Sequence, residues 1–175
     1  MSAEKEPQLL YGGEFLRLMR RGHWDYVERT NSWAVAIIVA VTPGDKLLLV
    51  EQFRLPVNRS VIELPAGLVG DAGADEPLVE AARRELLEET GYAAAQIEIL
   101  ASGPVTAGLS NEVSYFCAAR GLVREGPGGG DDSEDIRVHE VLLADLPAWL
   151  ARAGKNAAID PKIYAGLWLL RSNIQ

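Results

Sequence analysis

The stretch RRELLEETG, residues 83–91, contains Glu85, Glu88 and Glu89 in close succession. On a helix these positions are related by i, i+3 and i+4, so their side chains would converge over one turn. Helix surfaces commonly carry acidic residues as solvated charge. The first question is therefore whether these carboxylates belong to an exposed surface or to a site.

The residues around this stretch predict a helix from about Pro77 to Thr90. Proline suits a first helical turn, and Gly91 suits the position that follows a helix end. Asp75 or Glu76 can accept hydrogen bonds from the free N–H groups at the start. Residues 83–91 would then form the second half of one amphipathic helix.

A helical wheel places one of the acids where a solvated charge is not expected. With Ala82 at the centre of the buried stripe, Leu78 and Leu86 lie on the same face. Glu89 falls about 20° from that centre. An ionised carboxylate that faces a core needs a partner, so Glu89 indicates more than surface charge.

Charge pairing accounts for only part of the cluster. Arg84 can pair with Glu88, and Glu80 can pair with Arg84, at i, i+4 spacing. Glu85 and Glu89 then face each other, and a divalent cation such as Mg²⁺ or Mn²⁺ would relieve their repulsion. The alternative is that lysine or arginine from elsewhere in the fold neutralises them.

Composition limits the classes of function. The chain has 175 residues, a mass of 19.0 kDa and 48% hydrophobic residues, enough for one domain with a real core. Its formal charge of −8 argues against nucleic-acid binding, which needs a basic face. A small phosphorylated substrate remains compatible, because a cation can mediate between acidic protein and anionic ligand.

The single cysteine and the N-terminus bear on the compartment. Cys117 lies in an apolar run and is expected to be a buried structural thiol in a reducing environment. The N-terminus lacks the pattern of a secretory signal. No apolar stretch reaches the roughly 20 residues that span a bilayer. We expect a cytoplasmic protein that has no membrane partner.

Hydrophobic patterns further along the chain predict strands and two more helices. The continuous apolar run 33–41 is typical of a strand buried on both faces, and 47–55 is predicted to be its hairpin partner after the turn at 42–46. Other strands are expected within 14–30 and at 96–102, 112–120 and 135–143, with helices at 146–154 and after Pro161. Strands do not alternate strictly with helices, so a mixed sheet with helices packed on it is predicted.

The sequence from Glu76 to Tyr92 resembles the signature of the Nudix hydrolases. That signature is a glycine, five residues, Glu, seven residues and R-E-U-x-E-E-x-G-U, where U is apolar or aromatic. Every fixed position from Glu76 onward is filled. Counted without gaps the glycine is Gly70, but the preceding ELPAG (63–67) favours Gly67, with three additional residues before the helix.

The resemblance implies an α/β fold, a Nudix α/β/α sandwich with a mixed β-sheet over residues 33–175. Residues 1–32 would form a short N-terminal β segment used for dimerisation, which gives a homodimer. Nudix enzymes use Mg²⁺, with Mn²⁺ as a possible substitute, to hydrolyse a nucleoside diphosphate linked to another moiety.

The resemblance also assigns roles on the helix. Glu85 and Glu89 would be the main metal ligands. Glu88 and the backbone carbonyl of Ala66 would contribute to the metal site. Arg84 would orient the glutamates rather than contact substrate.

Two further segments resemble the ADP-ribose pyrophosphatase branch. VEQFRLPV (50–57) is similar to a strand that ends in a phosphate-contacting arginine, here Arg54. DSEDIRVHEV (132–141) is similar to a segment that follows an acidic loop and presents a glutamate to the attacking water, here Glu134. Glu134 would act as the general base or position the water.

A third loop and a tryptophan concern substrate binding. TAGLSNE (106–112) is similar to a loop of the same branch, with Gly108 and Glu112 as substrate-binding positions and Ala107 where proline is usual. Trp24, in the N-terminal segment, could stack on the base. Trp33 begins a core strand and is expected to pack there.

These residues together predict Mg²⁺-dependent cleavage of ADP-ribose, or of a similar nucleoside diphosphate sugar, to a nucleoside monophosphate and a sugar phosphate. Two alternatives stay open. The substrate could be GDP-mannose or another nucleotide sugar, or the domain could sense a nucleotide without hydrolysing it.

Overall fold

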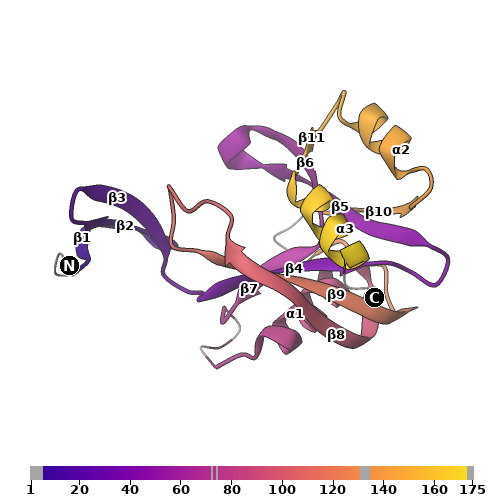
Figure 1. The fold of residues 1–175 in the computed structure, drawn as a ribbon, viewed down its shortest axis with the longest axis horizontal. Helices are drawn as coiled ribbons and strands as arrows, with labels where there is room; N and C mark the ends of the chain where they lie inside the picture. The colour runs from indigo at the N-terminus through magenta and orange to yellow at the C-terminus, as the bar shows by residue number, and fades with distance from the viewer. Residues whose placement is uncertain (1–5, 72, 74, 131–134, 173–175) are drawn as a thin grey trace.

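The computed structural model describes residues 6–71, 73, 75–130 and 135–172, which form three sheets and three α-helices (Figure 1). The N-terminal sheet contains β1 (Gln8–Gly12), β2 (Leu16–Arg21) and β3 (Trp24–Arg29). The β4 sheet has the order β7 (Ala66–Val69), β4 (Ala34–Ala40), β9 (Val113–Arg124) and β8 (Tyr92–Pro104).

The second sheet of the body, the β5 sheet, has the order β10 (Arg137–Leu142), β5 (Lys46–Arg54), β6 (Arg59–Glu63) and β11 (Ala158–Ile159). The helices are α1 (Leu78–Thr90), α2 (Leu146–Ala153) and α3 (Lys162–Ser172), with a short 3₁₀ turn at Leu55–Val57. Because β4–β9 and β6–β11 pair in parallel while the other pairs are antiparallel, the predicted mixed α/β architecture is confirmed.

Strand β4 lies between two hydrophobic cores, as its continuous apolar sequence predicts. Ala36 and Ile38 belong to the core under α1, whereas Ile37 and Val39 belong to the core that includes residues of α2 and α3. Successive side chains of a strand point to opposite faces, so one strand supplies both cores. The sheet therefore has helices on its two faces, which is the α/β/α arrangement expected from the sequence.

The predicted hairpin between residues 33–41 and 47–55 is wrong. β4 pairs with β7 and β9, whereas β5 pairs with β10 and β6 in the other sheet. The two strands share only the isolated bridge Val41↔Leu47 next to the turn among the described residues. Both strands are buried, so each takes partners on both of its edges within its own sheet.

The N-terminal sheet stands beside the body rather than within its cores (Figure 1). The hydrogen bond from Val27 N to Leu109 O, 2.8 Å, connects β3 to the loop between β8 and β9. Large apolar side chains of this sheet and its connections remain exposed. They are Leu9, Leu10, Tyr11, Phe15, Leu16, Leu18 and Trp24.

Two smaller expectations can be compared with the structure. Cys117 is fully buried on β9, and burial raises the pKa of its thiol to about 11, so the expected structural thiol is confirmed. Among the described helices, none has the length and apolar character needed to cross a membrane.

A charged cluster links β10 of the β5 sheet to residues of the β4 sheet. Glu140 on β10 accepts hydrogen bonds from the Tyr92 hydroxyl at 2.7 Å and the Lys46 ammonium at 3.1 Å, and it pairs with Arg124 at 3.3 Å. The Tyr92 hydrogen bond, followed by Lys46, lowers the pKa of the Glu140 carboxyl against the opposing effect of burial.

We expect Glu140→Gln to destabilise the protein by about 1 kcal/mol at pH 7, after allowance for solvent screening. Since the folded-state pKa is depressed, this contribution is present above the unfolded pKa and is lost as pH falls through the folded value. Urea unfolding at pH 7 and pH 3.5 measures the difference. The exposed Glu125→Gln is the matched control, and an equal loss at both pH values would contradict the ionic contribution.

Candidate active site

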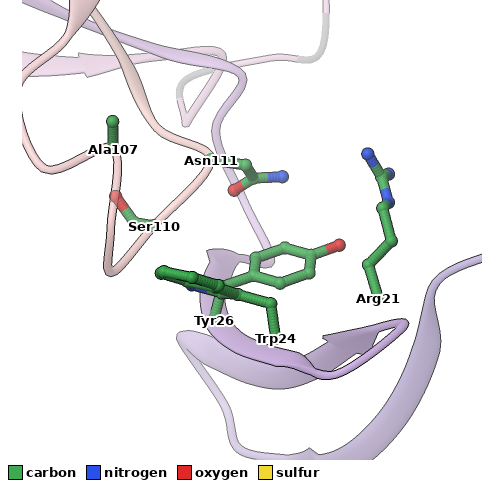
Figure 2. A pocket seen from close by; sticks show the side chains of 6 residues that line it. All are labelled: Arg21, Trp24, Tyr26, Ala107, Ser110 and Asn111. Atoms are coloured by element: carbon green, nitrogen blue, oxygen red, sulfur yellow. The ribbon is translucent and has the colours of Figure 1, made fainter.

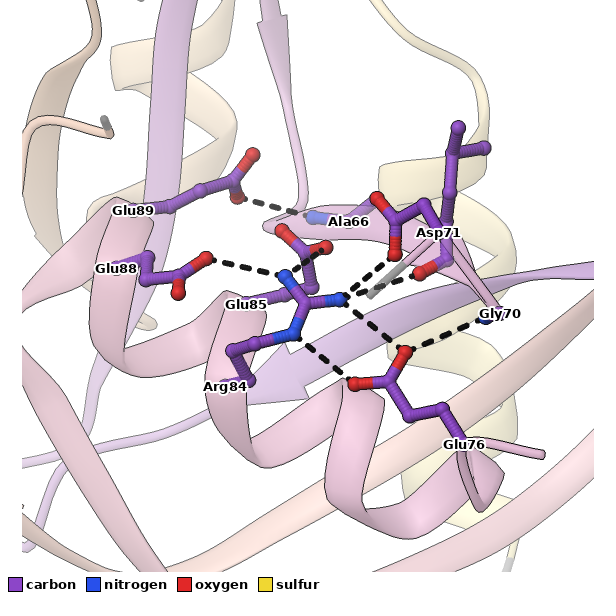
Figure 3. Close-up of polar contacts among 9 residues, drawn as sticks. Ala66, Gly70, Asp71, Glu76, Arg84, Glu85, Glu88 and Glu89 are labelled. Carbon is purple, nitrogen blue, oxygen red and sulfur yellow. Dashed lines mark hydrogen bonds and ion pairs between the residues drawn. The ribbon is translucent and has the colours of Figure 1, made fainter. Parts of the chain in front are cut away.

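Helix α1 carries the acidic cluster beside β7, and Glu89 is its most buried member. Only 3% of Glu89 is exposed, and its Oε2 accepts a hydrogen bond from the Ala66 backbone N–H at 3.0 Å (Figure 3). The expectation that this carboxylate needs a partner is confirmed. Ala66 thus contacts Glu89 through its amide, and the role of its carbonyl as a metal ligand stays a prediction.

Arg84 lies at the centre of the cluster (Figure 3). Its guanidinium contacts Glu85 at 2.8 Å, Glu88 at 3.1 Å, Glu76 at 3.0 Å and Asp71 at 3.0 Å. The hydrogen bond to Glu76 is the largest cause of a raised pKa of Arg84, and the charges of Glu85 and Asp71 add to it. A guanidinium in this position fixes the directions of the surrounding carboxylates, as a positioning role requires.

Two local predictions about α1 are wrong. Neither Asp75 nor Glu76 caps the helix, because Pro77 is the capping residue and makes no side-chain cap. The Glu76 carboxylate instead binds Arg84. Glu80 pairs with Arg83, at 3.8 Å, rather than with Arg84, which turns toward β7.

Gly67 allows Glu85 to reach the strand. A Cβ atom built at residue 67 would overlap the carboxyl carbon of Glu85. The structure therefore gives a steric reason for glycine at 67, the position that the sequence favours for the signature. Gly70, the alternative, has a positive φ of 99° and donates its N–H to Glu76 at 3.3 Å, so it is held by the same cluster.

Glu85 has the electrostatics expected of a cation ligand. Burial raises the pKa of its carboxyl to about 7, and the neighbouring Arg84 opposes that rise. A desolvated carboxylate gains strongly from a nearby positive charge. Carboxylate oxygens are also the donors that Mg²⁺ and Mn²⁺ prefer.

As the side chains lie, no three Asp, Glu, His or Cys residues in the described parts of the chain converge closely enough to hold a metal ion. Arg84 occupies the space among Glu85, Glu88 and Glu76. The donor chemistry and the space that Gly67 leaves for Glu85 nevertheless fit a divalent cation.

A glycine-rich segment, residues 126–130, packs against the end of α1. Gly129 N donates to the carbonyl of Glu89 at 2.9 Å, and Gly130 N donates to the carbonyl of Glu88 at 3.1 Å. These bonds satisfy carbonyl groups that a helix end leaves without partners. The last turn of α1, which carries two of the three candidate carboxylate ligands, is held by this segment.

Glu134, the candidate general base, follows the glycine-rich segment and lies outside the described residues. The segment before it packs closely against the helix end at Gly128, which has a φ of 70°. Only glycine fits there, because a Cβ atom would overlap the carbonyl carbon of Thr90.

A cleft of about 470 Å³ opens beside the acidic cluster. Both signs of charge line it. Its charged residues are Arg29, Arg54, Glu63, Asp71, Arg84, Glu85, Glu88, Glu112 and Lys162. Arginine and lysine side chains beside a carboxylate cluster suit an anionic ligand that binds together with a metal cation.

The cleft brings together residues from distant parts of the sequence. Arg54 at the end of β5 pairs with Glu63 at 2.7 Å, and Glu112 pairs with Arg29 at 2.5 Å. Arg54 and Glu112 are predicted substrate-binding residues. Arg29 was missed, since it ends a strand of the N-terminal segment and reaches the cleft only through the packing of that sheet.

A second cavity, of about 270 Å³, lies between the N-terminal sheet and the loop after β8 (Figure 2). Trp24 and Tyr26 rise from β3; the Trp24 ring points toward Ser110 of that loop, and the Tyr26 hydroxyl points toward the side of Arg21. The Trp24 ring N–H donates to the carbonyl of Gly108 at 3.2 Å. The predicted substrate residues Trp24 and Gly108 are therefore neighbours, in a cavity with the aromatic wall that a base needs.

A smaller cavity, of about 170 Å³, shares lining residues with both of these sites. It shares Asn111 with the aromatic cavity and shares Arg29 and Glu112 with the cleft. Trp33 lines it and is 50% exposed, so this side chain is less buried than a packing role predicts. The three cavities therefore border one another through shared residues.

These features define a class of α/β proteins in which an acidic helix beside a mixed sheet faces a charged cleft. Residues 31–164 match the NUDIX domain family, and the chain belongs to this family. The expected signature and sandwich fold are thereby confirmed.

The chain is similar to several known proteins. It is 40% identical over 111 residues to a methanol dehydrogenase activator of Bacillus methanolicus, covering 63% of this chain and 58% of that protein. It is 37% identical over 113 residues to an ADP-ribose pyrophosphatase of Bacillus subtilis, covering 64% and 59%. The matches thus span less than two thirds of either relative.

A solved structure supports the fold alone. The chain resembles the crystal structure of an ADP compounds hydrolase with a TM-score of 0.74 and 20% identity. The likeness covers 98% of this chain and 95% of the other. It therefore includes the N-terminal sheet as well as the two-sheet body.

Proposed function

We propose that this protein hydrolyses the pyrophosphate bond of ADP-ribose, or of a similar nucleoside diphosphate sugar, to a nucleoside monophosphate and a sugar phosphate. The observation that carries the proposal is the burial of Glu85 against Gly67 within a cleft that also contains Arg29 and Arg54. The similarity to an ADP-ribose pyrophosphatase supports the choice of substrate class.

Mg²⁺ is the proposed cofactor, with Mn²⁺ as a substitute. Glu85 and Glu89 would hold it, and Glu88 and the carbonyl of Ala66 would contribute. A bound divalent cation would supply positive charge to the diphosphate and lower the pKa of a water molecule. Arg84 would keep the carboxylates directed toward the cleft through its present ion pairs.

The other candidate site residues would bind the substrate and accept a proton. The guanidinium groups of Arg54 and Arg29 are suited to the oxygens of the diphosphate. Glu112 holds Arg29 in place. Glu134 would accept the proton of the attacking water, as a general base must.

Trp24 is proposed to stack on the base, with Gly108 fixing its ring by the hydrogen bond described above. We expect Trp24→Ala to raise KM for ADP-ribose roughly tenfold, because stacking on an aromatic ring contributes about 1–3 kcal/mol per base. The kcat should change little, since the ring binds ground state and transition state equally. Steady-state kinetics of Trp24→Ala and of Trp168→Ala, an exposed tryptophan on α3, test this; equal effects would contradict stacking.

We also propose that residues 1–32 form a homodimer contact. The exposed apolar side chains of the N-terminal sheet form a surface of the kind that marks protein–protein contacts. Sedimentation velocity of the full chain should find a dimer at micromolar concentration. A monomer at all concentrations would contradict this proposal and leave the hydrolase proposal intact.

A substrate panel tests the proposed reaction. ADP-ribose, GDP-mannose and diadenosine polyphosphates would be incubated with the protein and Mg²⁺, and the rates of hydrolysis compared. We expect ADP-ribose to have the highest kcat/KM. Preference for GDP-mannose would favour another nucleotide-sugar pyrophosphatase, and nucleotide binding without hydrolysis of any compound would favour a sensing domain.

A further inference from the structure

We infer that Lys162 recognises the sugar on the far side of the diphosphate, by donating hydrogen bonds from its ammonium group to sugar hydroxyls. Lys162 would thus determine which group attached to the nucleoside diphosphate is accepted. The inference rests on the proposed function and adds a specificity residue from the C-terminal helix.

Lys162 is held at the wall of the cleft by its local structure. It is the first residue of α3, and its ammonium forms an ion pair with the buried carboxylate of Asp160. Asp160 also accepts the Lys162 backbone N–H at 2.8 Å, and the Asp160 N–H donates to Ile62 O on β6 at 2.9 Å. The long side chain is therefore anchored from both of its ends while it lines the cleft.

The arrangement of cavities gives the cleft a direction. The smaller cavity shares Asn111 with the aromatic cavity, and it shares Arg29 of β3 and Glu112, the residue before β9, with the cleft. Lys162 belongs to another part of the lining, near Glu63 of the β5 sheet, which pairs with Arg54 of the same sheet. If the base lies on Trp24, the portion of the substrate beyond the diphosphate reaches the side that carries Lys162.

The donors of the cleft are suited to different parts of such a substrate. The forked guanidinium groups of Arg29 and Arg54 match phosphate oxygens. An ammonium group has three N–H donors, and among the described residues the side chain of Lys162 has Asp160 as its one hydrogen-bonded partner. Its remaining donors can serve hydroxyl oxygens, which are arranged differently in different sugars.

A comparison of substrates that differ in one part at a time tests the inference. Wild type, Lys162→Gln and Lys162→Arg would be assayed with ADP-ribose and ADP-glucose, which differ in the sugar, and with ADP-ribose and IDP-ribose, which differ in the base. We expect Lys162→Gln to lower kcat/KM for ADP-ribose on the order of tenfold. The ADP-ribose to ADP-glucose ratio should change by a similar factor, and the ADP-ribose to IDP-ribose ratio should stay constant.

Lys162→Arg separates recognition from a structural role. Arginine preserves the ion pair with Asp160, so a purely structural lysine would be fully rescued, whereas a recognising lysine would leave the sugar ratio altered. If Lys162→Gln does not fold, the sugar ratio of Lys162→Arg decides between the two roles. Lys155→Gln, an exposed lysine in the turn after α2, is the matched control.

The outcomes distinguish this inference from the proposed function. If wild type hydrolyses none of the compounds, the proposed function fails. If wild type is active but Lys162→Gln behaves like Lys155→Gln, the inference about Lys162 alone is overturned. An equal loss for all substrates would place Lys162 on the shared diphosphate and would also overturn it.

Discussion

Replacing Glu85 or Glu89 by glutamine is expected to reduce kcat/KM for ADP-ribose by on the order of a hundredfold to a thousandfold, the cost of losing one preorganised charge at a reacting centre. Glutamine keeps the shape of the side chain and removes the charge that a divalent cation needs. The Mg²⁺-dependent rise in Tm should disappear in parallel, because a ligand that binds only the folded protein stabilises it.

Loss of activity in these variants should not reflect unfolding. Glutamine at 89 can still accept the Ala66 N–H, and glutamine at 85 removes a partly desolvated charge. Glu80→Gln, on the exposed side of the same helix, is the matched control and should keep full activity. Hydrolysis that both Glu85→Gln and Glu89→Gln leave unchanged would exclude these residues as metal ligands.

Gly67→Ala is expected to cause a loss of similar size without removing any functional group. The added methyl would occupy the place of the Glu85 carboxyl group, so that side chain must leave its position beside β7. A displacement of about 1 Å at a catalytic centre can cost a hundredfold in rate. We expect kcat to fall by about that factor and the Mg²⁺ concentration at half-maximal rate to rise.

Gly73→Ala, after the end of β7, provides the control, because a Cβ at that position meets no atom within 4 Å. Gly73→Ala should therefore retain wild-type kinetics. Far-ultraviolet circular dichroism would verify that Gly67→Ala is folded. If folded Gly67→Ala matched wild type in its Mg²⁺ dependence, the close contact between Gly67 and Glu85 would have no role in cation binding.

The parts of the fold that periodicity describes could be predicted from the sequence. The wheel places Ala82, Leu86 and Glu89 on one buried face, and all three are buried. The burial on both faces of the strand within residues 33–41 was also predictable. Strand pairing was not, because the short turn at 42–46 is compatible with a hairpin and also with a chain that passes from one sheet to another.

The placement of the candidate ligands on one helix was predictable, because these residues follow each other on α1. Arg84, Glu85, Glu88 and Glu89 needed only helix geometry and the signature. Arg29 and Lys162 have no local signal, because one lies in the N-terminal sheet and the other opens the last helix. Only tertiary packing brings them to the same cleft.

The most direct test of the central claim is product analysis after incubation with ADP-ribose in Mg²⁺ or in EDTA. We predict equal amounts of AMP and ribose 5-phosphate with Mg²⁺, and neither product with EDTA. Intact ADP-ribose in both conditions, or cleavage that is equally fast in EDTA, would contradict a cation-dependent pyrophosphatase built on Glu85 and Glu89.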